Sequence, residues 1–247
     1  MTLPVFSIAV ATLRDIARFA LNHPLAVAIA TICVVPIEYH LALMEVSGRA
    51  MSSPPNFAVA WALTVAAQLI WLPLFLLAIR EVVSGQKLRL QAGRPSAATG
   101  RYAAYNVALL LASLATFAGS LESAGATIVR LVLAVVLCWL AIRTTLTFSA
   151  LALGRLDLGL IQSIARTTGL TWRLLAIMLV PAAAMMAVIF AFMAAMGTLL
   201  DVADGDAYLY PIVFLSVACQ FALFVPAIAG AHVYRRLEGD AGQNGRY

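Results

Sequence analysis

Long apolar segments alternate with short polar ones along the chain. Six apolar runs have about the length that a helix needs to cross a hydrocarbon core of roughly 30 Å. They cover approximately Leu25–Leu43, Phe57–Ile79, Tyr102–Ala118, Ile128–Leu151, Leu174–Leu200 and Leu209–Ala231. Strands of a membrane barrel would instead alternate apolar and polar positions over about ten residues. The pattern therefore predicts an all-α, polytopic membrane bundle of six transmembrane helices.

Two shorter segments combine basic and apolar residues at helical spacing. The segment LRDIARFALN places Arg14 and Arg18 on one side of a helix and Ile16 and Leu21 on the other. The segment LIQSIARTTG repeats this arrangement around Arg166. Both patterns are typical of helices that lie in the plane of a membrane interface.

Basic residues indicate how the runs are threaded. Thirteen of the sixteen Lys and Arg residues lie before the first run, after the second and fourth runs, or after the sixth. Because such residues favour the cytoplasmic side, both termini are expected to be cytoplasmic. We expect an amphipathic interfacial helix in 1–23, the six-helix bundle in 24–237 and a flexible cytoplasmic tail in 238–247.

The amino-acid composition supports a membrane location and favours anionic lipid over nucleic acid as the partner. The 247 residues are 63% apolar and 11% charged, far from the balance of a soluble domain. Fifteen arginines against one lysine are typical of a GC-rich bacterial genome, which suggests the bacterial inner membrane. The net charge of +5 is spread along one membrane face, so we expect anionic lipid rather than nucleic acid as its partner. The candidate lipid-facing bases are Arg14, Arg18, Lys87, Arg89, Arg166 and Arg173.

Motifs for catalysis, metal binding or nucleotide binding are not recognisable. The three cysteines fall in separate apolar runs without the spacing of metal ligands. The loop GQKLRLQAGRPSAATGR has six residues between Gly93 and Gly100, where a phosphate-binding loop has four. We therefore expect no catalytic residue, no metal site and no cofactor.

Glu38 and Arg143 are the ionisable residues placed deepest in the apolar runs. At a rise of about 1.5 Å per residue they would lie on the order of 9 Å apart along the membrane normal. Their side chains would lean toward each other, because side chains tilt toward the N-terminus of their helix. They are expected either to form a structural ion pair or to make Glu38 a proton or substrate site. His40, two residues from Glu38, would lie on a different helix face.

Prolines and hydroxyl residues inside the runs have two possible roles. Pro36, Pro73, Pro181 and Pro226 each remove a backbone donor, which can bend a helix or free a carbonyl for an ion site. Threonines such as Thr144 are expected to bond carbonyls of their own helix.

The start of the fifth run resembles a known group of proteins. The segment SIARTTGLTWRLLAIMLVP and the dipeptide His23-Pro24 resemble uncharacterised bacterial six-span membrane proteins, which are loosely grouped with the membrane domain of glycerophosphoryl diester phosphodiesterases. The shared cluster is Thr168, Gly169, Trp172 and Arg173. The resemblance implies a fold and a topology. It implies no catalytic residue, because the chemistry of that enzyme resides in a soluble barrel without a counterpart in this sequence.

Two functions follow as expectations. The first is a non-enzymatic integral membrane protein that acts through lipids or partner proteins, including further copies of itself, as a scaffold, assembly factor or accessory subunit. The alternative is a small transporter or channel component centred on Glu38 and Arg143. An intramembrane enzyme ranks third, because no nucleophile and base can be paired by spacing.

Overall fold

The computed structural model describes residues 3–51, 56–88, 96–117, 124–199 and 209–244, and in these ranges the regular structure is helical. The predicted all-α class is confirmed. The helices are α1 (Val5–Asn22), α2 (Pro24–Met51), α3 (Phe57–Ser84), α4 (Ala97–Phe117), α5 (Ala124–Arg143), α6 (Thr145–Ala152), α7 (Leu160–Arg166), α8 (Thr171–Leu199), α9 (Leu209–Ala222) and α10 (Phe224–Asn244).

Five described segments are long and apolar enough to cross a membrane. They are Pro24–Met44, Phe57–Ser84, Gly125–Arg143, Thr171–Ala195 and Pro211–Glu238. The expected third run lies mainly in α4, which is not among these segments and carries Arg101 and Asn106. Length and composition therefore indicate a multi-pass membrane protein.

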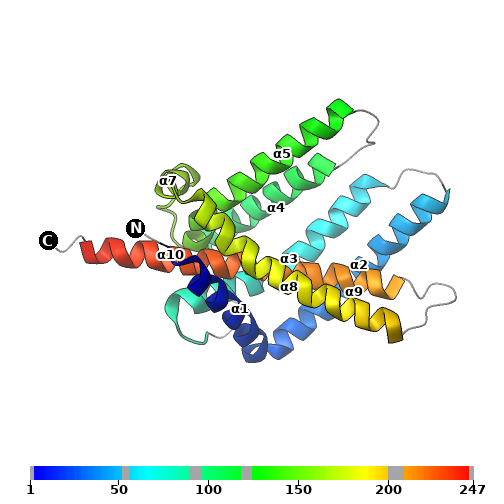
Figure 1. Cartoon of the computed structure of the whole chain (residues 1–247), viewed down its shortest axis with the longest axis horizontal. Helices are drawn as coiled ribbons and strands as arrows, with labels where there is room; N and C mark the ends of the chain where they lie inside the picture. Colours follow the sequence, from blue (N-terminus) through cyan, green and yellow to red (C-terminus); the bar gives the residue numbers. More distant parts are fainter. Residues whose placement is uncertain (1–2, 52–55, 89–95, 118–123, 200–208, 245–247) are drawn as a thin grey trace.

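The long helices spread from one end of the molecule (Figure 1). The pairs α2–α3, α4–α5 and α8–α9 each pack side by side and point away from that end. Helix α10 runs through the end where they converge and packs against α1, α3, α6 and α8. The start of α1 and the last turns of α10 lie at this same end (Figure 1).

An aromatic cluster around Phe224 joins α10 to the rest of the bundle. The Phe224 ring is fully buried and its centre lies 4.7 Å from that of Phe75 and 5.9 Å from that of Trp71. Phe19 of α1 approaches from another side at 5.4 Å. Tilted and edge-on ring pairs of this kind are stabilising beyond the area that they bury. The cluster therefore holds α1, α3 and α10 together.

Helix breaks divide two apolar runs that were expected to be single spans. At Thr144, between α5 and α6, the hydroxyl donates to the carbonyl of Leu140 at 2.8 Å, as predicted for a threonine in a helix. The other break, at Leu223 between α9 and α10, comes three residues before Pro226, which has no N–H for the carbonyl of Ala222. The other interior prolines lie within continuous helices.

The two ends of the described chain are helical. Helix α1 buries Ile8, Ile16 and Phe19 against α8 and α10. Its Leu21, expected on the same apolar side as Ile16, is 81% exposed. Helix α10 continues to Asn244, so the segment expected to be a flexible tail from residue 238 is helical that far.

Candidate functional site

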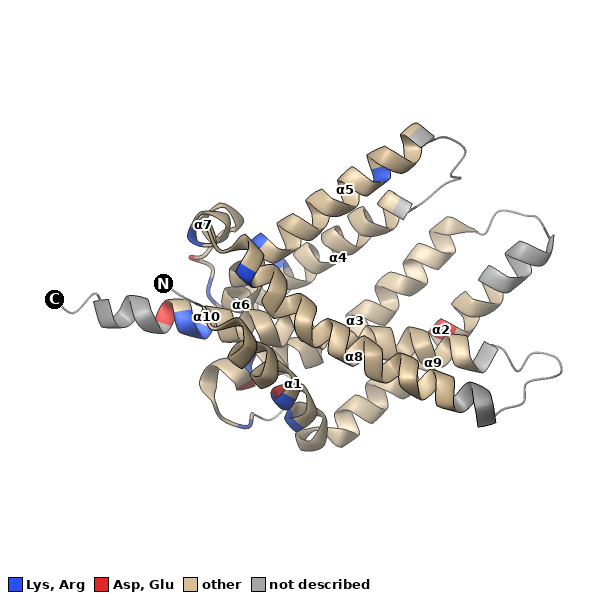
Figure 2. Ribbon diagram, in the orientation of Figure 1, with Lys and Arg blue, Asp and Glu red and all other residues tan. Residues whose placement is uncertain are grey.

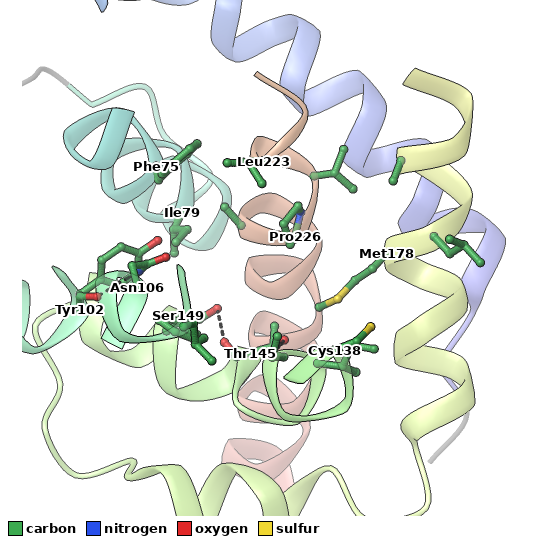
Figure 3. Close-up of a pocket in the computed structure, with 18 of the residues that line it drawn as sticks. Phe75, Ile79, Tyr102, Asn106, Cys138, Thr145, Ser149, Met178, Leu223 and Pro226 are labelled. Atoms are coloured by element: carbon green, nitrogen blue, oxygen red, sulfur yellow. Dashed lines mark hydrogen bonds between the residues drawn. The ribbon is translucent and has the colours of Figure 1, made fainter. Parts of the chain in front are cut away.

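An apolar cavity of about 390 Å³ opens between α3, α4, α5, α6, α8 and α10 (Figure 3). Its apolar walls include Phe75, Ile79, Leu109, Ile142, Phe148, Leu175, Met178, Leu179, Ala182, Val225 and Pro226. Cavities of this size with apolar walls and a few polar groups are typical of small-molecule sites. The cavity forms where α5 gives way to α6 and α9 gives way to α10, so the two helix breaks help to shape it.

Most polar groups in this cavity are already engaged by their own helices. Thr145 donates to the carbonyl of Ala141 at 3.1 Å, and Ser149 donates to that of Thr145 at 3.3 Å (Figure 3). The Asn106 amide donates to the carbonyl of Tyr102 at 3.0 Å. An apolar chain can therefore enter without leaving these donors unpaired.

Glu38 and Arg143, the predicted ion pair, are not brought together. Glu38 is 6% exposed in α2, and its Oε1 accepts from the Gln220 amide of α9 at 3.2 Å. Among the described residues no cation pairs with this carboxylate. Nearby His40 is exposed. Glu38 therefore lies in the contact between α2 and α9, where its partners are the neutral side chains of Gln220 and Ser216.

Arg143 lies at the end of α5, beside α7. Its Nη1 donates to the carbonyl of Ile164 at 3.2 Å, and its guanidinium carbon lies 5.3 Å from the centre of the Trp139 ring. Ser163 donates back to the carbonyl of Arg143 at 2.6 Å. Glu38 and Arg143 therefore have other partners than each other. The apolar run placed Arg143 near the centre of one long helix, whereas α5 ends at this residue.

Two contacts between histidine and a carboxylate were not anticipated from the sequence. His23 Nε2 lies 2.7 Å from Glu81 of α3, and His232 Nε2 of α10 lies 3.0 Å from Asp15 of α1. Glu81 also accepts from the backbone N–H of Leu88 at 2.7 Å. Both partners come from other helices, so no local spacing could have indicated them.

The candidate lipid-facing bases lie in different places in the structure and have different partners. Arg14, Arg18 and Lys87 line a polar cleft of about 530 Å³ between α1, α3 and α10. Arg166 pairs with Glu238 of α10, and Arg173 is exposed in α8. Arg89 lies outside the described residues.

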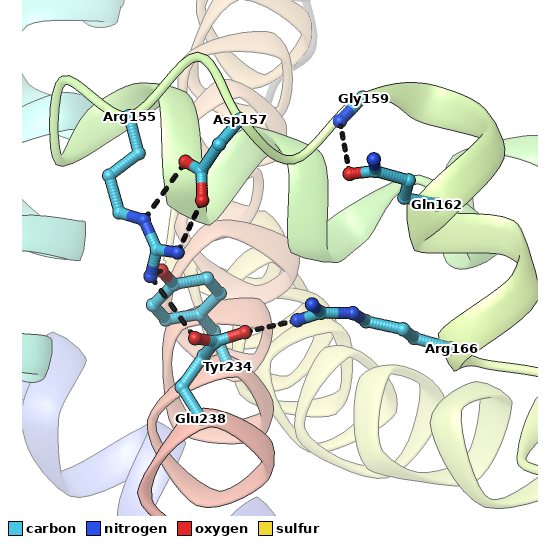
Figure 4. A network of polar contacts seen from close by, with 7 residues as sticks. All are labelled: Arg155, Asp157, Gly159, Gln162, Arg166, Tyr234 and Glu238. Carbon is cyan, nitrogen blue, oxygen red and sulfur yellow. Dashed lines mark hydrogen bonds and ion pairs between the residues drawn. The ribbon is translucent and has the colours of Figure 1, made fainter. Parts of the chain in front are cut away.

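A polar network ties α10 to the loop between α6 and α7 (Figure 4). Arg155 donates to Asp157 at 2.6 Å, to the Tyr234 hydroxyl at 2.6 Å and to Glu238 at 3.1 Å. Arg166 binds the other oxygen of Glu238. The hydrogen bond from Arg155 lowers the pKa of the Asp157 carboxyl, and the same bond raises the pKa of Arg155.

Comparison of the chain with protein-family models, with curated proteins and with solved structures finds no match. The resemblance to the membrane domain of the phosphodiesterases therefore stays a prediction. Within the described ranges no group of three His, Cys, Asp or Glu residues could hold a metal ion.

Proposed function

We propose that this chain is a non-enzymatic protein of the bacterial inner membrane that binds a lipid or another amphiphile in the apolar cavity. In this proposal the chain crosses the membrane six times, and both termini lie in the cytoplasm. Helix α4 is the third of these spans and adds to the five candidate segments. Any partner protein or further copy of the chain would act on the lipid-bound form.

The observation that carries this proposal is the cavity itself. Its volume of about 390 Å³ and its apolar walls suit an acyl or isoprenoid chain, and Gln68 and Asn106 supply amide groups for one polar contact. Lipid around a membrane helix needs no cavity to be accommodated. A cavity bounded by six helices therefore favours a specific ligand over ordinary bilayer contact.

Photocrosslinking tests the proposal. Purified protein in detergent is titrated with phosphatidylethanolamine that carries a diazirine in its acyl chain, and the crosslinked peptides are identified by mass spectrometry. We expect saturable crosslinking at Met178, removed by excess unlabelled lipid. The substitution Ala182→Phe should fill the cavity and abolish most of this crosslinking. The matched control is Ala183→Phe, because the adjacent Ala183 is exposed and does not line the cavity.

Two results would contradict lipid binding in the cavity. One is crosslinking at Met178 that does not saturate, which is the behaviour of bulk lipid. The other is equal crosslinking in the Ala182→Phe and Ala183→Phe proteins, provided that both unfold at the temperature of the unsubstituted chain.

A second candidate function is supported by Glu38 alone. A carboxylate at membrane depth normally has a cationic partner, and in the described part of the chain Glu38 has neutral ones, the Gln220 amide and the Ser216 hydroxyl. Such a residue can bind a proton or a small cation that reaches it from water through the helix bundle. Proton uptake by protein-loaded vesicles would be lost on Glu38→Gln, with Glu81→Gln as the control outside this site. Uptake that persists after Glu38→Gln would exclude this function.

A further inference from the structure

A cationic cleft lies where α1, α3 and α10 meet. Its volume is about 530 Å³, and it shares no lining residue with the apolar cavity among the residues described. Four exposed basic side chains and the amide of Asn22 line it. The bases are Arg14 and Arg18 of α1, Lys87 after α3, and Arg235 of α10.

Two acidic side chains at the base of this cleft are already engaged. Glu81 lies 2.7 Å from both His23 Nε2 and the backbone nitrogen of Leu88. Asp15 lies 3.0 Å from His232 Nε2, 3.5 Å from Arg14 Nε and 4.0 Å from Arg18 Nη1, so these two arginines share one carboxylate. Both carboxylates are largely buried, whereas the bases are exposed. Four bases face two carboxylates, so the open part of the cleft carries a net positive charge.

Helix α1 places this cleft next to an exposed apolar surface. Phe6, Val10 and Leu21 are 77%, 49% and 81% exposed. At about 100° per residue they form one stripe of α1, which adjoins the stripe of Arg14 and Arg18. A helix with both stripes exposed is suited to the boundary between acyl chains and headgroups. At that boundary the cleft would open at the level of the lipid phosphates.

We propose that the cleft binds a phosphate group, carried by the headgroup of an anionic phospholipid. The guanidinium groups of Arg14 and Arg18 can each give two parallel N–H donors to phosphate oxygens. Lys87 and Arg235 add charge from the opposite walls, and the Asn22 amide adds a neutral donor. This site does not rest on the proposed function, since the apolar cavity is lined by other residues.

Lipid retention measured by native mass spectrometry tests the site. Delipidated protein in detergent is titrated with phosphatidylglycerol or with phosphatidylcholine. The test variant is Arg14→Gln/Arg18→Gln, and a second is Lys87→Gln/Arg235→Gln, which leaves α1 unchanged. The matched control is Arg101→Gln/Arg173→Gln, which removes two exposed bases outside the cleft. A further control, Ala182→Phe, fills the apolar cavity.

We expect each cleft variant to bind phosphatidylglycerol about tenfold more weakly, because charge-assisted hydrogen bonds are lost. Both controls should bind it as the unsubstituted protein does. Titration with glycerol phosphate identifies the source of the phosphate. Weak binding compared with phosphatidylglycerol supports a lipid headgroup, and equal binding shows a soluble phosphate ester in the same site. The proposal is overturned if folded cleft variants retain phosphatidylglycerol like the controls, or if phosphatidylcholine binds equally well.

Discussion

Close contact between helices depends on single small residues, and Gly230 of α10 is the clearest case. A Cβ added at this glycine would collide with the Cγ2 methyl of Thr145 in α6 and would lie 3.6 Å from the Ser149 hydroxyl. Small residues at such crossings let two helix backbones approach closely. The sequence pattern gives no sign of this role for Gly230, because it depends on α6, a helix that the apolar pattern merges with α5.

Gly230→Ala should destabilise the protein by about 1–3 kcal/mol, the usual cost of an extra methyl group in a packed interior. Thermal unfolding in detergent measures this change. Thr145→Ser removes the methyl that the new Cβ meets and keeps the hydroxyl, so the double variant should recover part of the loss. Gly100→Ala is the control, because a Cβ at Gly100 of α4 would meet no atom within 4 Å. Equal unfolding temperatures for Gly230→Ala and Gly100→Ala would contradict this close contact.

At the scale of elements, the positions of the apolar runs predicted where helices lie. They did not predict where the helices break or which side chains link one helix to another. The run through Thr144 stays apolar on both sides and contains no proline, so it was assigned to one span, and Arg143 was placed too deep. The apolar run also gave no sign that α10 would extend past residue 238. Glu238, where this extension begins, binds Arg155 and Arg166 from a distant segment.

Loss of the Glu238 carboxylate should increase local opening of α7 and of the end of α10. We expect Glu238→Gln to increase hydrogen exchange in both helices, because Arg155 and Arg166 would lose their shared carboxylate. Exchange in α2, which does not take part in the network, should stay the same. Unchanged hydrogen exchange in α7 would show that the contacts of α7 with Arg143 are enough to stabilise it, and that its ion pair with α10 contributes little.

Asp157 gives the same network a dependence on acid. Its pKa is lowered in the folded protein by the hydrogen bond from Arg155, so its contribution to stability is present above the unfolded pKa of about 3.9. This contribution is lost as the pH falls through the lowered pKa of the folded state. The unfolding temperature of Asp157→Asn should therefore fall less on acidification below about pH 4 than that of the unsubstituted protein. Parallel curves would contradict a role for this carboxylate.

Basic residues are concentrated at one end of the molecule, so its two ends differ in charge. Figure 2 shows most of the Lys and Arg residues at the end where α1, α6, α7 and α10 meet, with few along the helices that extend from it. This polarity was visible in the sequence, because the bases follow alternate apolar runs. The Glu38–Gln220 and His232–Asp15 contacts were not, because 182 and 217 residues separate the partners. The spacing of the bases repeats along the chain and can be read from the sequence, whereas such contacts depend on which helices become neighbours.

If this charged end faces the cytoplasm, the two ends of the bundle should differ in their access to reagents. The three native cysteines, all exposed, are first replaced by serine. A cysteine at Gln86, after α3, should react with a membrane-impermeant maleimide only after the cells are permeabilised. One at Gly125, at the start of α5 where a side chain meets open space, should react in intact cells. The reverse pattern would invert the topology, and it would place the phosphate cleft in the outer leaflet. Labelling of both positions in intact cells would rule out the alternating path of α2 to α5 across the membrane.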